Sequence, residues 1–269
     1  MKNKNVQRPP VSAAWGILNS KADTQAILDE IDRDEEFGDA ELMTREIMRR
    51  LEALQNPTNT IGMKRFGITG SRILGIPVPV LRKMAKQIGK DHFVAQALWD
   101  SGVHEARLLA SMVGEPDQLT SEQMDAWMTD FDSWDVCDQA CGNLFDKNPL
   151  AWKKAAQWAR REKEFERRAG FALMATLAWH EKPRNGNTTL DKKFEAFFPL
   201  IIQYAVDERN FVKKAVNWAL RQIGKRNPSL RKKAIATAKQ ILRTHPESKA
   251  ARFVANDAIR ELSQPSKTP

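Results

Sequence analysis

Four segments of the chain repeat one helical pattern, in which lysine or arginine stands beside small alanines and apolar residues complete the helix face. They cover residues 105–110, 167–172, 213–219 and 250–255. The basic residues Arg168, Lys214 and Arg252 follow one another at intervals of 46 and 38 residues. These intervals are near the roughly 40–47-residue period of stacked helical pairs, which bury their apolar faces against their neighbours. The pattern favours a helical array over the alternative, a set of alanine-rich and lysine-rich helices with no common arrangement.

The alternation of β-branched and polar residues that a strand requires is absent from the sequence, so we predict an all-α fold. The apolar spacing predicts two helices within 23–55 and an irregular section over 56–77. Thr120 is expected to cap the helix predicted over 121–130, because Gln123 follows it three residues later. Further helices are predicted over 93–99, from His104, and over 121–130, 134–145, 149–163, 164–180, 191–206, 208–224, 228–243 and 247–262.

The order of these elements predicts one domain, an α-solenoid of antiparallel helix pairs over residues 22–263. We expect an irregular leader at 1–21, a surface loop at 181–190 and a frayed tail at 264–269. No apolar run approaches the roughly 20 residues that a membrane span needs. The basic N-terminus lacks the apolar stretch of a signal peptide, and we expect a cytoplasmic monomer.

The two cysteines, Cys137 and Cys141, lie four residues apart on one predicted helix. A disulfide along a single helix turn would be strained, and no second pair of cysteine or histidine residues completes a zinc site. We therefore expect two buried thiols, which suits a reducing compartment. We also expect no metal and no other cofactor.

The net positive charge of the chain comes entirely from its second half. Residues 1–136 carry 16 Lys and Arg against 21 Asp and Glu, whereas residues 137–269 carry 27 against 13. A net charge of +14 on half a chain, facing one side of a helical array, indicates a polyanionic partner.

The basic half begins at a helix that places an aromatic ring beside an acid. Trp134 and Asp138 are four residues apart, so the indole and the carboxylate share one helix face. A structural interpretation remains open, in which Trp134 belongs to the core and Asp135 or Asp138 is only a capping or solvated acid. In the functional interpretation the pair looks into a groove, and Asp138 faces solvent, so that replacing it with asparagine changes stability by only about half a kcal/mol.

Four segments together resemble the AlkD-like DNA alkylation repair family, the HEAT-like-repeat alkylpurine DNA glycosylases. They are 79–82, 104–110, 134–138, and the pair formed by 167–169 with 215–221. The resemblance covers residues 40–245 in the same order. It implies that the protein binds duplex DNA on a concave basic face and hydrolyses the N-glycosidic bond of purines alkylated at N3 or N7.

Carried over to this chain, the resemblance implies a role for each of several residues. Asp138 corresponds to the catalytic carboxylate, and Trp134 and Trp218 correspond to the aromatic walls of the site. Arg168 and Arg221 correspond to arginines that hold the DNA backbone. We add Lys213 and Lys214 as expected phosphate contacts because of the charge asymmetry.

The residue types suit this chemistry, because an alkylated purine is cationic and leaves without a strong acid. A carboxylate can stabilise the positively charged sugar, and indole faces can hold it. Two alternatives remain: a DNA-binding relative with little or no excision activity, and a helical scaffold that binds an acidic protein.

Overall fold

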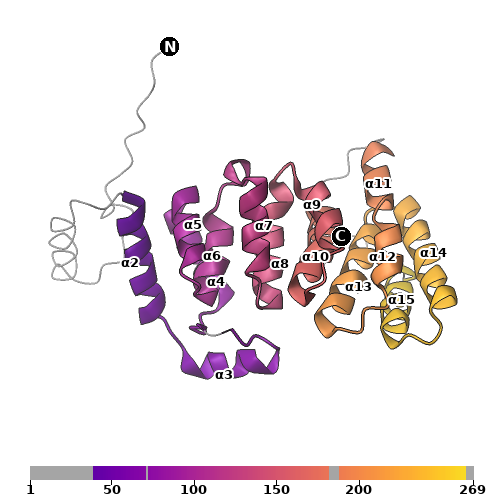
Figure 1. The fold of residues 1–269 in the computed structure, drawn as a ribbon, viewed down its shortest axis with the longest axis horizontal. Coiled ribbons are helices and arrows are strands. Elements are labelled where there is room, and N and C mark those ends of the chain that lie inside the picture. The colour runs from indigo at the N-terminus through magenta and orange to yellow at the C-terminus, as the bar shows by residue number, and fades with distance from the viewer. Residues whose placement is uncertain (1–38, 71, 182–187, 265–269) are drawn as a thin grey trace, which may run out of the picture. The chain divides into compact units, whose positions relative to one another are not determined.

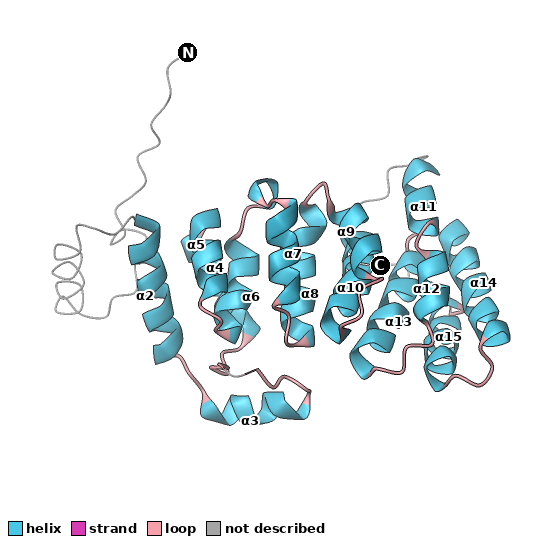
Figure 2. Cartoon of the chain, in the orientation of Figure 1, coloured by secondary structure: helices cyan, strands magenta, loops and turns pink. Residues whose placement is uncertain are grey.

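A computed structural model describes residues 39–70, 72–181 and 188–264 of the chain (Figure 1). Every regular element in these ranges is a helix, as Figure 2 shows, which confirms the all-α prediction. The described residues divide into two compact units: unit 1 comprises those up to 66 and those within 70–115, and unit 2 comprises 67–69 and those from 116 onward. The predicted leader at 1–21 and the first predicted helix lie outside the described residues. No described helix is long and apolar enough to cross a membrane.

The described part of unit 1 holds α3 and four helices that pack together. Its elements are α2 (Asp39–Ala53), α3 (Pro57–Arg65), α4 (Val78–Ile88), α5 (His92–Asp100) and α6 (His104–Val113). Helix α6 packs on α4 and α5, and α2 packs on α5. Leu81, Leu98, Trp99 and Leu109 are fully or almost fully buried in the core between them.

A buried acid, Glu105 in α6, fixes the segment that leads into α4. Its carboxylate accepts hydrogen bonds from the backbone N–H groups of Leu74 at 2.8 Å, Gly75 at 2.6 Å and Ile76 at 3.2 Å. The Glu105 side chain has no exposed surface. Buried backbone donors need such partners, because leaving one unpaired costs about 1–3 kcal/mol.

We predict that Glu105→Ala lowers the free energy of unfolding by about 3 kcal/mol or more, because three backbone donors lose their acceptor at once. Urea denaturation measures this loss. Glu122→Ala provides the matched control, since Glu122 is an exposed acid in the first turn of a helix in unit 2. Equal stabilities of the two variants would contradict the role of Glu105 as the acceptor for these three donors.

Unit 2 stacks its longer helices around α10. Its elements are η2 (Pro116–Gln118), α7 (Ser121–Thr129), α8 (Trp134–Asn143), η3 (Phe145–Lys147), α9 (Ala151–Trp158), α10 (Glu164–His180), α11 (Thr188–Glu195), α12 (Phe198–Tyr204), α13 (Asn210–Lys225), α14 (Pro228–Thr244) and α15 (Lys249–Leu262). Helix α10 packs against α8, α9 and α13, and twelve of its seventeen residues are buried. Gly170 permits the close approach of α9, because a Cβ there would lie 2.2 Å from the backbone nitrogen of Ala159.

The helix predictions fail in two places. Helix α3 occupies part of the section predicted to be irregular: Pro57 stands at its start, and the Asn56 side chain caps it by accepting from the Asn59 N–H. The helix predicted over 191–206 is two helices, α11 and α12, with Pro199 in the first turn of the second. The Thr120 cap is confirmed, since its hydroxyl accepts from the Gln123 N–H at 3.1 Å.

Candidate nucleic-acid interface

Helix α8 begins at the first residue of the proposed site. Ser133 precedes the helix in an extended conformation, Trp134 is its first residue, and Asp138 follows one turn later. Both side chains are half-buried. Because they are four residues apart in a helix, they share one helix face, as the sequence predicted. Trp134 is therefore largely covered without being fully enclosed in the core, and the structural interpretation stays open beside the functional one.

A buried arginine holds Asp138 in place. Arg168 of α10 donates from Nε to Oδ1 of Asp138 at 3.0 Å and from Nη2 to Oδ2 at 2.8 Å. Its Nη1 donates to the backbone carbonyl of Phe211, in the first turn of α13, at 2.6 Å. One guanidinium group thus joins α8, α10 and α13.

The charges of the two partners depend on each other. Burial raises the pKa of Asp138 above its ordinary value, and the charge and hydrogen bonds of Arg168 oppose this rise. Burial also disfavours the charged guanidinium, but the attraction of Asp138 outweighs this and raises the pKa of Arg168. Because arginine does not lose its proton in proteins, Arg168 remains a cation beside this carboxylate.

This geometry changes one expectation and leaves another open. The Asp138 side chain is 18% exposed and paired with arginine on both oxygens, so the expectation of a solvent-facing acid is wrong. Its replacement will therefore affect stability. The predicted contact between Arg168 and the DNA backbone stays a prediction, and it would require this side chain, 7% exposed, to exchange partners.

We predict that Asp138→Asn and Arg168→Met each destabilise the protein by about 3–5 kcal/mol, because each leaves one buried charge without its partner. The double variant should recover much of this loss, since it removes both charges. Urea denaturation of the four proteins gives the coupling energy directly. Additive losses in the double variant would show that the two side chains do not stabilise each other.

A second cluster of charges fixes α13 against the start of α10. Asp207 accepts from Arg167 of α10 at 2.7 Å and from Nε of Arg209 at 2.9 Å. Burial alone would raise the pKa of Asp207, but the hydrogen bonds from Arg209 and Arg167 outweigh it and hold that pKa at about 2. Arg209 also donates to the carbonyl of Glu162 at 2.6 Å. The end of α13 nearest Asp138 is therefore held by two networks.

The exposed stripe of α13 starts at this end. Phe211, Lys214 and Trp218 are three and four residues apart, so they lie on one face of the helix. Lys214 is exposed, whereas Trp218 and Lys213 are half-buried. Trp218 lies seven residues beyond Phe211, which corresponds to about 10 Å along the helix axis. Trp218 thus lies about two turns along α13 from the Phe211 carbonyl that Arg168 contacts.

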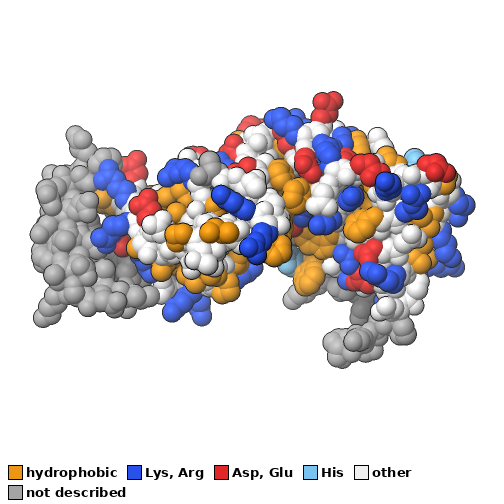
Figure 3. Space-filling view, turned by 90° about the horizontal axis from the view of Figure 1, so that it is seen from below, with side chains coloured by type: hydrophobic (Ala, Val, Ile, Leu, Met, Phe, Trp, Pro, Cys, Tyr) orange, Lys and Arg blue, Asp and Glu red, His pale blue; other side chains and the backbone are white. Residues whose placement is uncertain are grey.

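Arg221, the next residue of this stripe, already has acidic partners. Its Nη1 pairs with Glu261 of α15, and its Nε lies 3.5 Å from Oδ2 of Asp257. Lys225 also pairs with Glu261. The DNA contact predicted for Arg221 remains a prediction, and the attraction that Arg221 can exert on a phosphate is weakened by these acids. Figure 3 likewise shows lysine and arginine side chains interspersed with acidic and apolar ones on the face it presents.

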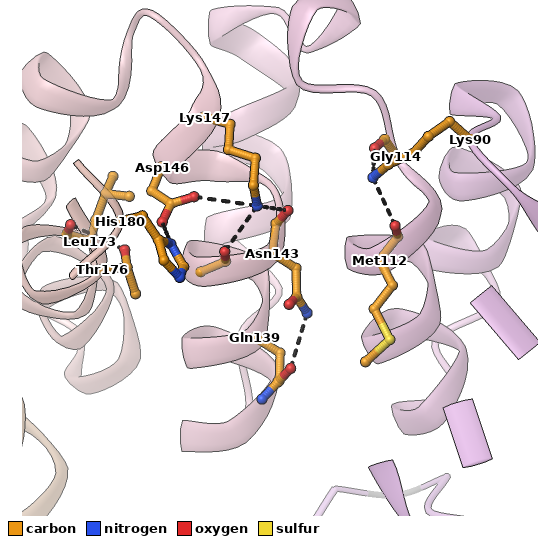
Figure 4. A network of polar contacts seen from close by, with 11 residues as sticks. Lys90, Met112, Gly114, Gln139, Asn143, Asp146, Lys147, Leu173, Thr176 and His180 are labelled. Carbon is orange, nitrogen blue, oxygen red and sulfur yellow. Dashed lines mark hydrogen bonds and ion pairs between the residues drawn. The ribbon is translucent and has the colours of Figure 1, made fainter. Parts of the chain in front are cut away.

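Sequence reasoning missed a polar cluster at the other end of α8. The ring of His180, the last residue of α10, contacts Asp146 of η3 through Nδ1 (Figure 4). Lys147 lies 3.7 Å from Oδ1 of Asp146 and donates to the carbonyl of Gly142 at 3.1 Å. Burial raises the pKa of Asp146, and the bond to His180 opposes this rise. No local motif could have indicated this pair, because its members are 34 residues apart.

Both cysteines are free buried thiols, as predicted. The Cys141 Sγ lies 3.6 Å from the carbonyl of Ala169, to which it donates. Burial raises the pKa of the Cys141 thiol well above its ordinary value. Among the described residues, no group of three or more His, Cys, Asp and Glu side chains is arranged to hold a metal ion.

Helices that stack on their neighbours in this way are typical of an α-helical repeat protein. A solved structure described as "a new family of proteins related to the HEAT-like repeat DNA glycosylases with affinity for branched DNA structures" has this fold. It matches with a TM-score of 0.64 and 18% identity, over 74% of this chain and 83% of that one. The solenoid prediction is confirmed by this likeness.

The chain belongs to the DNA alkylation repair enzyme family, whose model matches residues 47–262. An uncharacterised protein of Listeria innocua serovar 6a, Lin0241, is 23% identical over 218 residues. This match covers 80% of the chain and 93% of the relative. The family resemblance found in the sequence is confirmed.

Proposed function

We propose that the protein binds duplex DNA on the face formed by α8, α10 and α13 and excises purines alkylated at N3 or N7. Membership of the DNA alkylation repair enzyme family supports the role in DNA repair. The observation that carries the excision step is the carboxylate of Asp138, partly exposed and fixed on both oxygens by Arg168. Trp134 stands one turn before it on the same helix face.

The reaction is hydrolysis of the N-glycosidic bond. The bond between the purine nitrogen and C1′ breaks, and its electron pair neutralises the cationic base. A water oxygen then bonds to C1′ and releases a proton. Asp138 stabilises the positive charge that develops on the sugar, as a fixed anion placed where that charge appears. The indole faces of Trp134 and Trp218 bind the same cationic sugar.

Arg168 acts in this proposal as a positioning residue. A bidentate arginine fixes both the distance and the plane of a carboxylate, which a single hydrogen bond does not. Its charge and hydrogen bonds also oppose the rise in the pKa of Asp138 that burial causes. The cost is that the arginine offsets part of the negative charge offered to the sugar.

The compensation of the Asp138 charge by Arg168 favours a second candidate function, DNA binding without excision. An acid paired on both oxygens has little net charge, and a purely structural pair would have the same geometry. The related structure is described as having affinity for branched DNA, not as an excising enzyme. Both candidates share DNA binding, and only the first requires base release.

The test of excision is release of free base from duplex DNA that contains 7-methylguanine. We expect the parent protein to release it without added metal, and Asp138→Asn to release it at least about 100-fold more slowly, since a transition-state charge is removed. DNA affinity should hold or rise, because a carboxylate near phosphates repels them. Measurements below the unfolding transition separate this loss from the lower stability of the variant.

Asp135→Asn is the matched control, since Asp135 lies on the same helix and is also half-buried. It should excise within a few-fold of the parent. If the parent binds DNA and releases no base, the second candidate is the correct one. Equal excision by the parent and Asp138→Asn would remove Asp138 from the mechanism.

We predict that DNA affinity falls with salt and that Lys214→Ala flattens the slope of log K against log salt by about one, the loss of one phosphate contact. Lys213→Ala should act in the same direction. Arg221→Ala should flatten it less, because Glu261 and Asp257 already compensate its charge. Titrations at four salt concentrations measure the slopes. A slope unchanged in the Lys213→Ala/Lys214→Ala variant would exclude this stripe from the interface.

A further inference from the structure

An open cleft of about 390 Å³ lies between the C-terminal ends of α10 and α13, away from Asp138. Six residues line it: Ala178, Trp179, Glu181, Gln222, Lys225 and Arg226. Arg168 lies near the start of α10 and contacts the start of α13, so the two helices run parallel and their ends meet at the cleft. The excision chemistry proposed above does not use this cleft.

The outer wall of the cleft is an exposed tryptophan. Trp179 is 67% exposed, although every residue of α10 from 168 to 178 is buried. A large aromatic ring in contact with water gains little from folding, since the burial of its apolar surface is the main favourable contribution. An exposed ring beside a cleft offers a flat face to a ligand, and nucleobases stack on such faces irrespective of sequence.

The inner wall carries a polar group without a protein partner. Gln222 is only 9% exposed, and its carboxamide makes no hydrogen bond to any described residue. A buried carboxamide normally pairs both its oxygen and its NH₂ group. One acceptor and two donors in a single plane match the hydrogen-bonding edge of a base. Gln222 is thus a second feature of the cleft, independent of Trp179, that can pair with a ligand.

The remaining residues set the charge and rigidity of the cleft. Arg226 donates to the carbonyls of Ala178 at 2.8 Å and Glu181 at 2.6 Å, which fixes the end of α10 against α13. Its guanidinium is therefore a structural element of the wall. Lys225, exposed at the rim, supplies the positive charge. Glu261 pairs with it and moderates that charge.

We propose that this cleft receives one unpaired nucleobase of the bound DNA. The base stacks on Trp179, its polar edge pairs with Gln222, and its phosphate approaches Lys225. The cleft is eleven residues beyond Arg168 on α10 and beyond Phe211 on α13, or about 16 Å along the helices. The inference rests on the proposed DNA binding but is independent of excision.

The experiment compares two duplexes without alkylated bases, one fully matched and one with a single unpaired 2-aminopurine. We expect the parent protein to bind the bulged duplex about tenfold more tightly, which is a typical contribution of one stacked base. Trp179→Ala should abolish this preference and leave the affinity for the matched duplex within twofold. Gln222→Leu, similar in size but without the amide, should reduce the preference several-fold. 2-Aminopurine fluorescence should be quenched by the parent and not by Trp179→Ala.

Two controls complete the design. Trp179→Phe retains a flat ring and should keep most of the preference, whereas Phe253→Ala removes a 41%-exposed aromatic of α15 and should change nothing. This inference is overturned if the protein binds the matched duplex in a salt-dependent manner but shows no preference for the bulge. It is also overturned if a preference survives Trp179→Ala. Either result leaves DNA binding intact. Failure to bind either duplex overturns the proposed function itself.

Discussion

The guanidinium group of Arg168 is the interaction on which the rest of unit 2 depends. It makes three hydrogen bonds, to two oxygens of one helix and to the backbone of another, from the second turn of α10. The residues that it joins are 30 and 43 positions away in the chain. The register of α8 and α13 on α10 and the position of the proposed catalytic acid are therefore set by the same bonds. A change that shifts the helices also moves Asp138.

The sequence predicted what depends on local signals. Helix α10 spans the predicted residues 164–180, and Thr120 forms the cap that its spacing from Gln123 indicated. The shared face of Trp134 and Asp138 followed from helical periodicity alone. The partner of Asp138 could not be derived in this way, because it depends on how far α8 is displaced along α10. A displacement of one turn would place a different residue opposite Arg168.

The errors in the helix assignment also have local physical causes. The section that starts at Asn56-Pro57 is predicted to be irregular, yet proline lacks only a donor that the first turn of a helix leaves unused. Asn56 caps α3 through its side chain, so the same residues that end one segment start the next. Pro199 lies in the first turn of α12, where a proline is tolerated, so a new helix begins there. The continuous apolar pattern of this stretch suggests a single helix instead.

The buried thiols of α8 have a consequence for the conditions under which such a protein works. Electrophiles that methylate purines also attack sulfur, and they react with the thiolate and not with the thiol. Cys137 and Cys141 are the only cysteines in the chain, and both are enclosed between α8 and α10. Burial raises the pKa of the Cys141 thiol and so keeps it protonated. The helix that carries the proposed catalytic acid is thereby shielded from the reagents that create the damage.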